Sequence, residues 1–202
     1  MKSRVSWSVA GQVYAADRVL VISLPAFLGD NRQFEVLFKP GPVRRAAGVL
    51  LGDGNLVLSI VDELRPVVEV CTPFASGWSR QQLRGLADIG LVDVWTLDRD
   101  PSESDGDLLV KSEDPLTPRS LMLIENDIVC PTVLKQAPKT FTADEVVVTR
   151  HEAISIDDER IHYVQTGPAA ETGDAPVYMR AIPLCRRHEN VDPRSLAHRA
   201  PE

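Results

Sequence analysis

Two histidines and several carboxylates are gathered in the short segment HEAISIDDERIH, which begins at His151 and ends at His162. If the flanking apolar segments form a hairpin around Asp157 to Glu159, the two imidazoles would come close. Two imidazoles with a carboxylate would suit zinc or iron. The spacing is not a recognised ligand motif, however, and the alternative is a hairpin with exposed polar residues at its tip.

The cysteines offer a second, weaker metal candidate. Cys185 and His188 have the C-x-x-H spacing found as half of many zinc sites, but Cys71 and Cys130 are lone thiols and supply no second pair. Three scattered cysteines also do not make a disulfide framework. We therefore expect reduced thiols, and a zinc site at Cys185 and His188 is disfavoured.

A third candidate is Glu69, a carboxylate inside the otherwise apolar segment VVEV. It is either a metal ligand or a half-exposed strand residue that faces water or a cross-strand arginine such as Arg65. Charged residues on a strand with one buried face usually point to solvent or to a partner of opposite charge, which favours the second interpretation.

The whole-chain composition is that of an ordinary soluble globular protein, with 202 residues, 44% hydrophobic and 25% charged. The net charge of -7 and the pI of about 5.2 repel phosphate backbones, so binding to nucleic acid would need a local basic patch or bridging metal ions. The longest apolar runs are too short to span a membrane. The amino terminus lacks the apolar core of a signal peptide. We expect a cytoplasmic protein without membrane contact.

Standard catalytic motifs are absent from the sequence. There is no GxSxG segment, no GxxxxGK[ST] phosphate loop and no GxGxxG after an apolar strand. The acidic loop DRDPSESDGD has Glu103 where a calcium-binding EF-hand requires glycine. These absences exclude the usual routes to nucleotide-dependent chemistry and to hydrolysis by a serine nucleophile.

Most of the chain has the alternation typical of strands. Val5, Trp7 and Val9 share one face of a period-two ribbon, and a turn at Asp17 and Arg18 predicts a hairpin with VLVISL. The next expected strands are FEVLF and then a meander of AAGVLLGDG, NLVLSIVD and RPVVEV.

One helix is expected, from about Arg80 to Ile89. Ser79 is a good N-cap and Gln82 completes a capping box. An apolar stripe then ends at a glycine suited to the helix C-terminus, and it consists of Leu83, Leu86, Ala87 and Gly90. VVEV, this helix and VDVWTL would form a βαβ unit with parallel strands and a right-handed crossover.

The remaining expected strands are DLLVKS, SLMLIENDIV, EVVVTRHEAISI, RIHYVQTG and APVYMRAIPL. The predicted fold class is therefore α+β and β-dominated, with a mixed sheet that contains one βαβ unit and a C-terminal β-rich extension. The expected organisation is a sheet domain over 1–130, the extension over 131–184 within the same or a second domain, and a tail over 185–202 that is mobile or docked through a partner.

The order of meander, VVEV strand, helix and tryptophan-containing strand resembles the bacterial family of putative restriction endonucleases of PD-(D/E)xK fold. The resemblance covers residues 67–98, and the matching positions are Val67, Val68, Glu69, Val70, Thr72, Pro73, Gly90, Leu91, Asp93, Trp95, Leu97 and Asp98.

The resemblance implies a nuclease site that holds Mg²⁺ or Mn²⁺. Glu69 would be one ligand, with Asp53 or Asp62 as the other, and the ion would polarise the scissile phosphate and activate a water molecule. The sequence departs from the family at the lysine that orients this water. Cys71 occupies the position two residues after Glu69, and Gln82 stands where the family often carries a lysine on the helix.

Two functions are thus open. A nuclease would bring Asp53 or Asp62 to Glu69 beside a groove lined by arginines such as Arg44, Arg45, Arg80 and Arg84. A non-catalytic protein-interaction or assembly module, acting on a protein partner or on itself, would instead have an exposed apolar patch or an unpaired strand edge. The acidic balance and the missing lysine favour the interaction module, whereas the βαβ pattern favours the nuclease.

Overall fold

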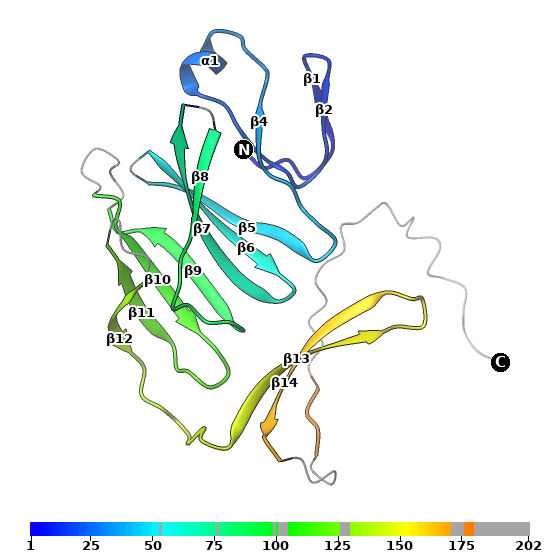
Figure 1. Ribbon diagram of the computed structural model, residues 1–202, viewed down its shortest axis with the longest axis vertical. Coiled ribbons are helices and arrows are strands. Elements are labelled where there is room, and N and C mark those ends of the chain that lie inside the picture. Colours follow the sequence, from blue (N-terminus) through cyan, green and yellow to red (C-terminus); the bar gives the residue numbers. More distant parts are fainter. Residues whose placement is uncertain are drawn as a thin grey trace, which may run out of the picture. The chain divides into compact units, whose positions relative to one another are not determined.

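The computed structural model describes residues 1–52, 54–75, 77–98, 100, 105–125, 130–170 and 176–179, and strands dominate this part of the chain (Figure 1). Residues Met1–Ala169 form one compact unit, and of the remainder, Ala170–Glu202, only 170 and 176–179 are described. The pairings between the described strands are all antiparallel. The β-dominated fold class is confirmed, while the domain boundaries expected near 130 and 184 stay predictions.

The N-terminal ribbon folds back on itself earlier than the alternation predicted. Strand β1 (Trp7–Val9) pairs with β2 (Gln12–Tyr14) around Ala10 and Gly11, which have positive φ angles of 48° and 74°. Two successive residues in this conformation make the tight turn that matches the twist of a hairpin. The partner expected for this ribbon, VLVISL, contributes only β3 (Val19–Val21), and β3 pairs with β4 (Glu35–Phe38).

Between β3 and β4 the chain forms the short helix α1 (Leu24–Leu28). The Ser23 side chain accepts a hydrogen bond from the Ala26 amide, which caps its first turn. In the same region, the fully buried Tyr14 accepts a hydrogen bond from the Phe34 amide at 2.8 Å and donates one to Gln12 Oε1 at 2.7 Å. Tyr14, Leu20 and Phe34 form a small apolar cluster of this region.

The first four-stranded sheet is a meander in chain order. Its strands are β5 (Arg44–Gly52), β6 (Asn55–Asp62), β7 (Arg65–Phe74) and β8 (Gly77–Gln82). The first three match the expected meander. The fourth replaces the beginning of the expected helix.

The helix expected over 80–89 is wrong, and with it the βαβ unit. Residues up to Gln82 belong to β8. The Leu83 amide then bonds to the Val68 carbonyl of β7, whereas in a helix it would bond to a carbonyl four residues earlier. Gly85 has φ 71° and Gly90 has φ 143°, neither of which fits an α-helix. Leu83 and Leu86 still reach one apolar cluster. The two leucines are therefore apolar because both pack against this cluster, although the segment that carries them is not a helix.

The second four-stranded sheet has the order β12-β11-β10-β9 and is also a meander. Its strands are β9 (Leu91–Thr96), β10 (Leu108–Glu113), β11 (Ser120–Ile124) and β12 (Thr132–Gln136). Strand β12, whose five residues are all exposed, was not predicted from the sequence. A strand without a buried face lacks the alternation on which such predictions depend.

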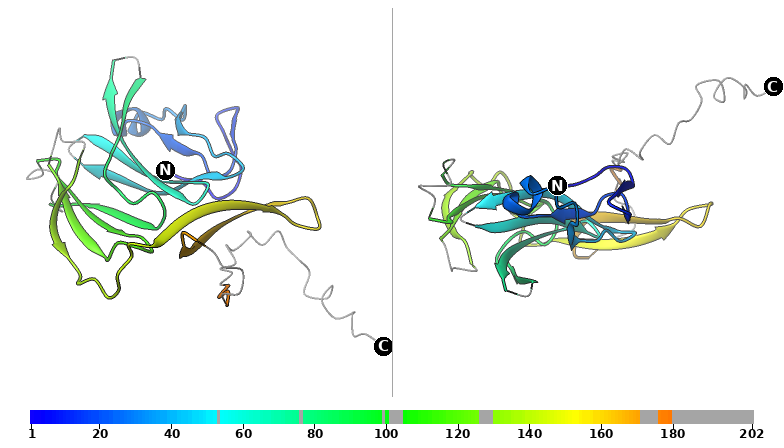
Figure 2. Two further views of the ribbon diagram at one scale, coloured as in Figure 1. Left: turned by 60° about the horizontal axis from the view of Figure 1, so that its bottom comes forward. Right: turned by 90° about the horizontal axis from the view of Figure 1, so that it is seen from above.

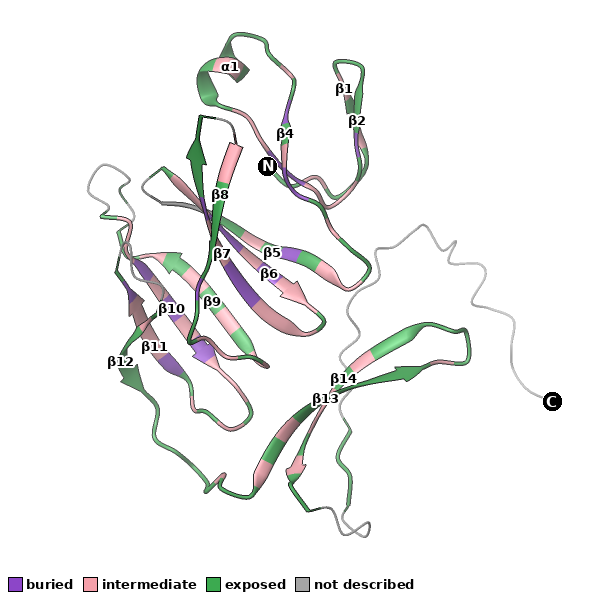
Figure 3. Ribbon diagram, in the orientation of Figure 1, coloured by how far each residue is buried: buried purple, intermediate pink, exposed green. Residues whose placement is uncertain are grey.

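The central strands β6 and β7 of the first sheet carry buried residues (Figure 3), and these residues belong to two apolar clusters. Leu58, Val67 and Cys71 pack on one face with residues of β3 and β4, whereas Val57 and Val68 pack on the other with residues of β10 and β11. Successive side chains of a strand point to opposite faces, so each central strand supplies both clusters. Figure 2 shows the sheets from two further sides.

A long hairpin follows the second sheet. Strand β13 (Val146–Ile154) pairs with β14 (Arg160–Pro168), and the turn at residues 155–159 is the one expected. The described part of the last expected strand, 176–179, is not in a strand, and residues 180–184 and the tail over 185–202, with Cys185 and His188, lie outside the described residues. No helix in the described ranges is long and apolar enough to cross a membrane.

Candidate functional site

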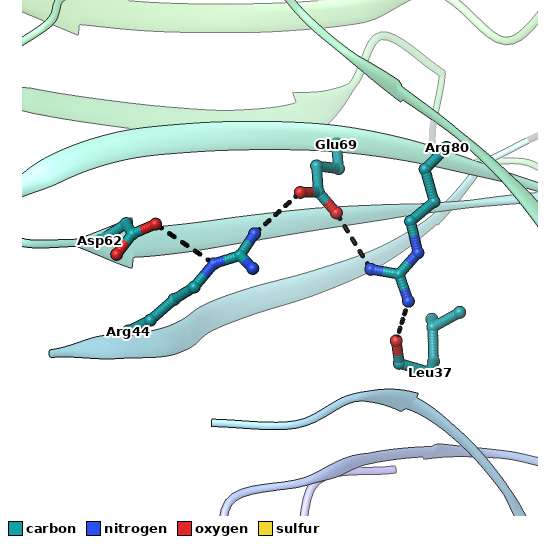
Figure 4. A network of polar contacts seen from close by, with 5 residues as sticks. All are labelled: Leu37, Arg44, Asp62, Glu69 and Arg80. Carbon is teal, nitrogen blue, oxygen red and sulfur yellow. Dashed lines mark hydrogen bonds and ion pairs between the residues drawn. The ribbon is translucent and has the colours of Figure 1, made fainter. Parts of the chain in front are cut away.

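Glu69, the candidate metal ligand, is held by two arginines from neighbouring strands (Figure 4). Arg44 Nη2 lies 3.0 Å from Glu69 Oε1, and Arg80 Nη1 lies 3.2 Å from Glu69 Oε2. Arg44 Nε also lies 3.4 Å from Asp62 Oδ2, and Arg80 Nη2 donates to the Leu37 carbonyl. We call Arg44, Asp62, Glu69 and Arg80 the Glu69 ion cluster.

The sheet register places this cluster on one face. Glu69 lies opposite Leu58 and Gln82, Arg80 lies opposite Cys71, and Arg44 lies opposite Asp62. This is the face that packs against β3 and β4, and the Glu69 side chain is only 13% exposed there. Two guanidinium groups balance two carboxylates, so the cluster carries no net charge at neutral pH.

Both oxygens of Glu69 are used by the arginines, and Asp62 faces Arg44 rather than Glu69. Asp53 lies outside the described residues. Within the described ranges no group of three or more His, Cys, Asp or Glu side chains is arranged to hold a metal ion. Gln82 lies in β8 instead of on a helix. An arginine partner such as Arg65 was expected for Glu69. Its partners are instead Arg44 of β5 and Arg80 of β8. Arg65 Nη2 lies 3.4 Å from Asp88 Oδ1.

A shallow hollow of about 740 Å³ lies beside this sheet, and its lining includes Arg65, Arg80, Arg84, Asp88 and Cys130. Arg80 is neutralised by Glu69 and Arg65 faces Asp88. Two of the three arginines that line the hollow therefore face carboxylates, which weakens the positive potential that a phosphate backbone would need.

Cys71 provides a direct check on this region, because its side chain is fully buried in the same face. Burial raises the pKa of the Cys71 thiol, with smaller effects of Arg80, which lowers it, and of Glu69, which raises it. In a Cys185→Ser chain we expect iodoacetamide to modify the exposed Cys130 and to leave Cys71 intact until urea unfolds the protein. Mass spectrometry of the labelled peptides measures this, and labelling of native Cys71 at the rate of Cys130 would contradict the burial.

The β13–β14 hairpin brings His151 and His162 near each other in the fold but onto opposite faces. His151 pairs with Tyr163 and His162 pairs with Glu152 in the register, so the two imidazoles occupy adjacent, alternating positions. His151 stacks on Tyr163 with ring centroids 5.2 Å apart, and His162 Nε2 lies 4.0 Å from Glu152 Oε2. The two histidines therefore do not converge on one ion.

The hairpin exposes several apolar side chains. Val147, Ile161 and Tyr163 lie on one face with 43%, 51% and 44% of their surface exposed, and none of them belongs to the apolar clusters of the described residues. An isolated two-stranded hairpin is marginally stable in water, because it has no further strand or helix on which to pack. Additional contacts would therefore stabilise this hairpin.

The outer edge of β13 is open to pairing. Two backbone bonds fix which groups face β14: the Ser155 amide bonds to Glu159 and the Ala169 amide bonds to Glu145. Bonded and unbonded pairs alternate in an antiparallel ladder. The odd-numbered residues of β13 therefore bond to β14, and the even-numbered ones direct their N–H and C=O groups outward. The outward Val146 amide bonds to the Ala143 carbonyl, and the other outward residues are Val148, Arg150, Glu152 and Ile154.

Among the described residues, none pairs with this edge between Val148 and Ile154. The strand contains no proline, lysine or bulge, which are common devices that protect edge strands. In the described part of the chain, β14 is its one paired neighbour. The strand was predicted from the sequence but this edge was not, although a nine-residue strand without proline is a usable signal.

Comparisons with known proteins show what the chain is similar to. No protein-family model matches the sequence, and no curated protein sequence matches it. Among solved structures, a post-proline cleaving enzyme from Rickettsia typhi superposes with a TM-score of 0.67 at 16% identity, over 84% of this chain and 24% of that one. A structure from a study of two prolyl endopeptidases superposes with a TM-score of 0.54 at 14% identity, over 67% of this chain and 19% of that one.

These likenesses concern the fold, and this chain spans about a quarter or less of each neighbour's length. They overturn the resemblance to restriction endonucleases of PD-(D/E)xK fold. The segment 67–98 carries the same residue pattern, but it folds into antiparallel strands of two sheets instead of the strand, helix and strand of that family's core.

Proposed function

We propose that this chain is a non-catalytic interaction module that binds a protein partner by adding a strand to the outer edge of β13. The observation that carries the proposal is the open edge of β13 on a hairpin whose apolar side chains are exposed. In strand addition, backbone hydrogen bonds supply affinity and alternate side chains supply specificity. The acidic net charge and the neutral Glu69 ion cluster support a protein partner over nucleic acid.

The proposal is tested with a displayed peptide library selected against the immobilised full chain. We expect selected peptides to alternate apolar and polar residues and to bind the Val148→Ala chain like wild type. They should lose binding to Val148→Pro, because proline removes an outward N–H while edge positions otherwise tolerate it. Selected peptides that bind Val148→Pro as well as wild type would contradict strand addition at β13.

A second candidate function is suggested by the likeness to post-proline cleaving enzymes, namely that the chain is a structural part of such a peptidase. We expect the purified chain to release no reporter from a chromogenic peptide with proline before the reporter group. The described histidines support this expectation, since His151 contacts Thr149 and Tyr163 and His162 faces Glu152. Turnover that scales with chain concentration and survives repurification would contradict a non-catalytic role.

A further inference from the structure

The sequence of β13 is self-complementary about its central histidine. Counting outward from His151, Arg150 is matched by Glu152, Thr149 by Ala153, and Val148 by Ile154. An antiparallel copy of the same strand, centred on the same residue, would place each member of these pairs opposite the other. Cross-strand pairs of opposite charge or of apolar side chains stabilise a sheet, and like charges destabilise it.

We propose that the partner at this edge is a second copy of the chain, paired β13 to β13 about a two-fold axis at His151. The inference rests on the proposed function and names its partner. Two hairpins joined in this way form a four-stranded antiparallel sheet, β14-β13-β13-β14, which has the strand number of the other two large sheets. The interface is isologous, as a two-fold dimer requires.

Two features select this register: which residues of β13 direct their backbone N–H and C=O groups outward, and where the charged side chains lie. The even-numbered residues of β13 face outward, so pairing must place them opposite even-numbered residues of the second copy. An axis at His151 does so, because Arg150 meets Glu152 of the second copy. An axis at Arg150 or at Glu152 keeps the same phase but puts two arginines or two glutamates directly opposite each other.

The side chains available at the edge suit this arrangement. Within the described residues Arg150 makes no ion pair, whereas Glu152 lies 3.5 Å from Arg160 on its own hairpin. The dimer would give Arg150 a carboxylate partner and continue a row of charges from Arg160 through Glu152. Ile154, which is 68% exposed, would pack against Val148 of the second copy.

Charge reversal tests the register. Sedimentation velocity of the full chain over a concentration series should show a dimer for wild type. Arg150→Glu and Glu152→Arg should each raise the dimer Kd by about tenfold or more, because each puts like charges opposite each other twice. An equimolar mixture of the two variants should recover a heterodimer. In that heterodimer the introduced glutamate of one chain meets the introduced arginine of the other, and the retained Arg150 meets the retained Glu152.

Lys135→Glu on the exposed strand β12 is the matched control and should dimerise like wild type.

A cross-link tests the axis independently. His151 would face its own copy in an unbonded pair, where Cα atoms are about 4.5 Å apart and a disulfide can form. In a Cys130→Ser, Cys185→Ser chain, His151→Cys should therefore oxidise to a covalent dimer, and Ile161→Cys on β14 should not.

Wild type that stays monomeric, or a mixture of variants that does not associate better than either alone, would overturn the second-copy inference. If peptides selected on the chain still depend on the Val148 amide in that case, strand addition stands and the partner is a different protein. Circular dichroism of each variant confirms that the strands are retained, so that lost dimerisation is assigned to the edge.

Discussion

Replacing Gly90 by alanine is expected to lower the free energy of unfolding by about 3 kcal/mol. Gly90 precedes β9 with φ 143°, a conformation that side-chain-bearing residues rarely adopt. A Cβ atom there would lie 2.1 Å from the Glu113 carbonyl oxygen and 3.0 Å from Asp114 Cα, and both are backbone atoms that cannot rotate away. The substitution must therefore separate the start of β9 from the end of β10.

Two glycine controls distinguish the clash from the backbone strain. Gly11→Ala has φ 74° with no atom within 4 Å of the new Cβ, so it should cost about 1 kcal/mol from conformation alone. Gly48→Ala meets Ser59 Cβ at an ordinary 3.8 Å and should be close to neutral. Urea unfolding monitored by tryptophan fluorescence measures all three. Equal losses at Gly90 and Gly11 would mean that the close approach does not matter.

Gly90 also helps to explain why a helix was wrongly predicted over residues 80–89. The capping box at Ser79 and Gln82 and the stripe that ends at Gly90 are typical signals of a helix, and only Gly85 in its interior counted against one. The outcome was decided by contacts distant in sequence, because the edge of β7 was available to β8 and Gly90 fits against the end of β10. Local patterns cannot register such partners, so strands with one buried face were predictable and this segment was not.

For the β13–β14 hairpin, in contrast, the local sequence was sufficient to predict the strands and the turn. Two segments that read as strands, joined by a polar turn, predicted β13 and β14, and the turn lies where it was expected. The register was not predicted, and it is the register that places His151 and His162 on opposite faces of the hairpin. The same register, once known, turns Arg150 and Glu152 from ordinary exposed charges into a self-complementary pair.

The candidate site was predictable in kind but not in detail. A partly buried glutamate on a strand should meet an arginine, and Glu69 does. Arg44 was not identifiable as its partner, because it comes from β5, which is separated from β7 by β6 in the sheet. Its guanidinium reaches across one strand, lies over the Phe38 ring and joins Asp62 to Glu69. Long side chains bridge such distances in ways that spacing along the sequence does not encode.

Removing the Glu69 carboxylate is expected to be the second large effect, a loss of about 2 kcal/mol for Glu69→Ala. The substitution leaves Arg44 and Arg80 facing each other on a packed sheet face, with one carboxylate, Asp62, to balance two guanidinium groups. Both arginines remain about 40% exposed, which moderates the penalty through solvent screening. Glu69→Gln should lose less, because its amide oxygen still accepts a hydrogen bond from one arginine.

The control for this prediction is a surface pair with a shorter distance. Lys111 Nζ lies 2.6 Å from Asp93 Oδ2, but the two side chains are 33% and 59% exposed, so Asp93→Ala should cost less than about 1 kcal/mol. A double-mutant cycle with Glu69→Ala and Arg80→Ala measures the coupling directly, and we expect the pair to cost less than the sum of the single changes. Additive losses, or an Asp93→Ala effect as large as that of Glu69→Ala, would show that burial does not strengthen the Glu69 ion cluster.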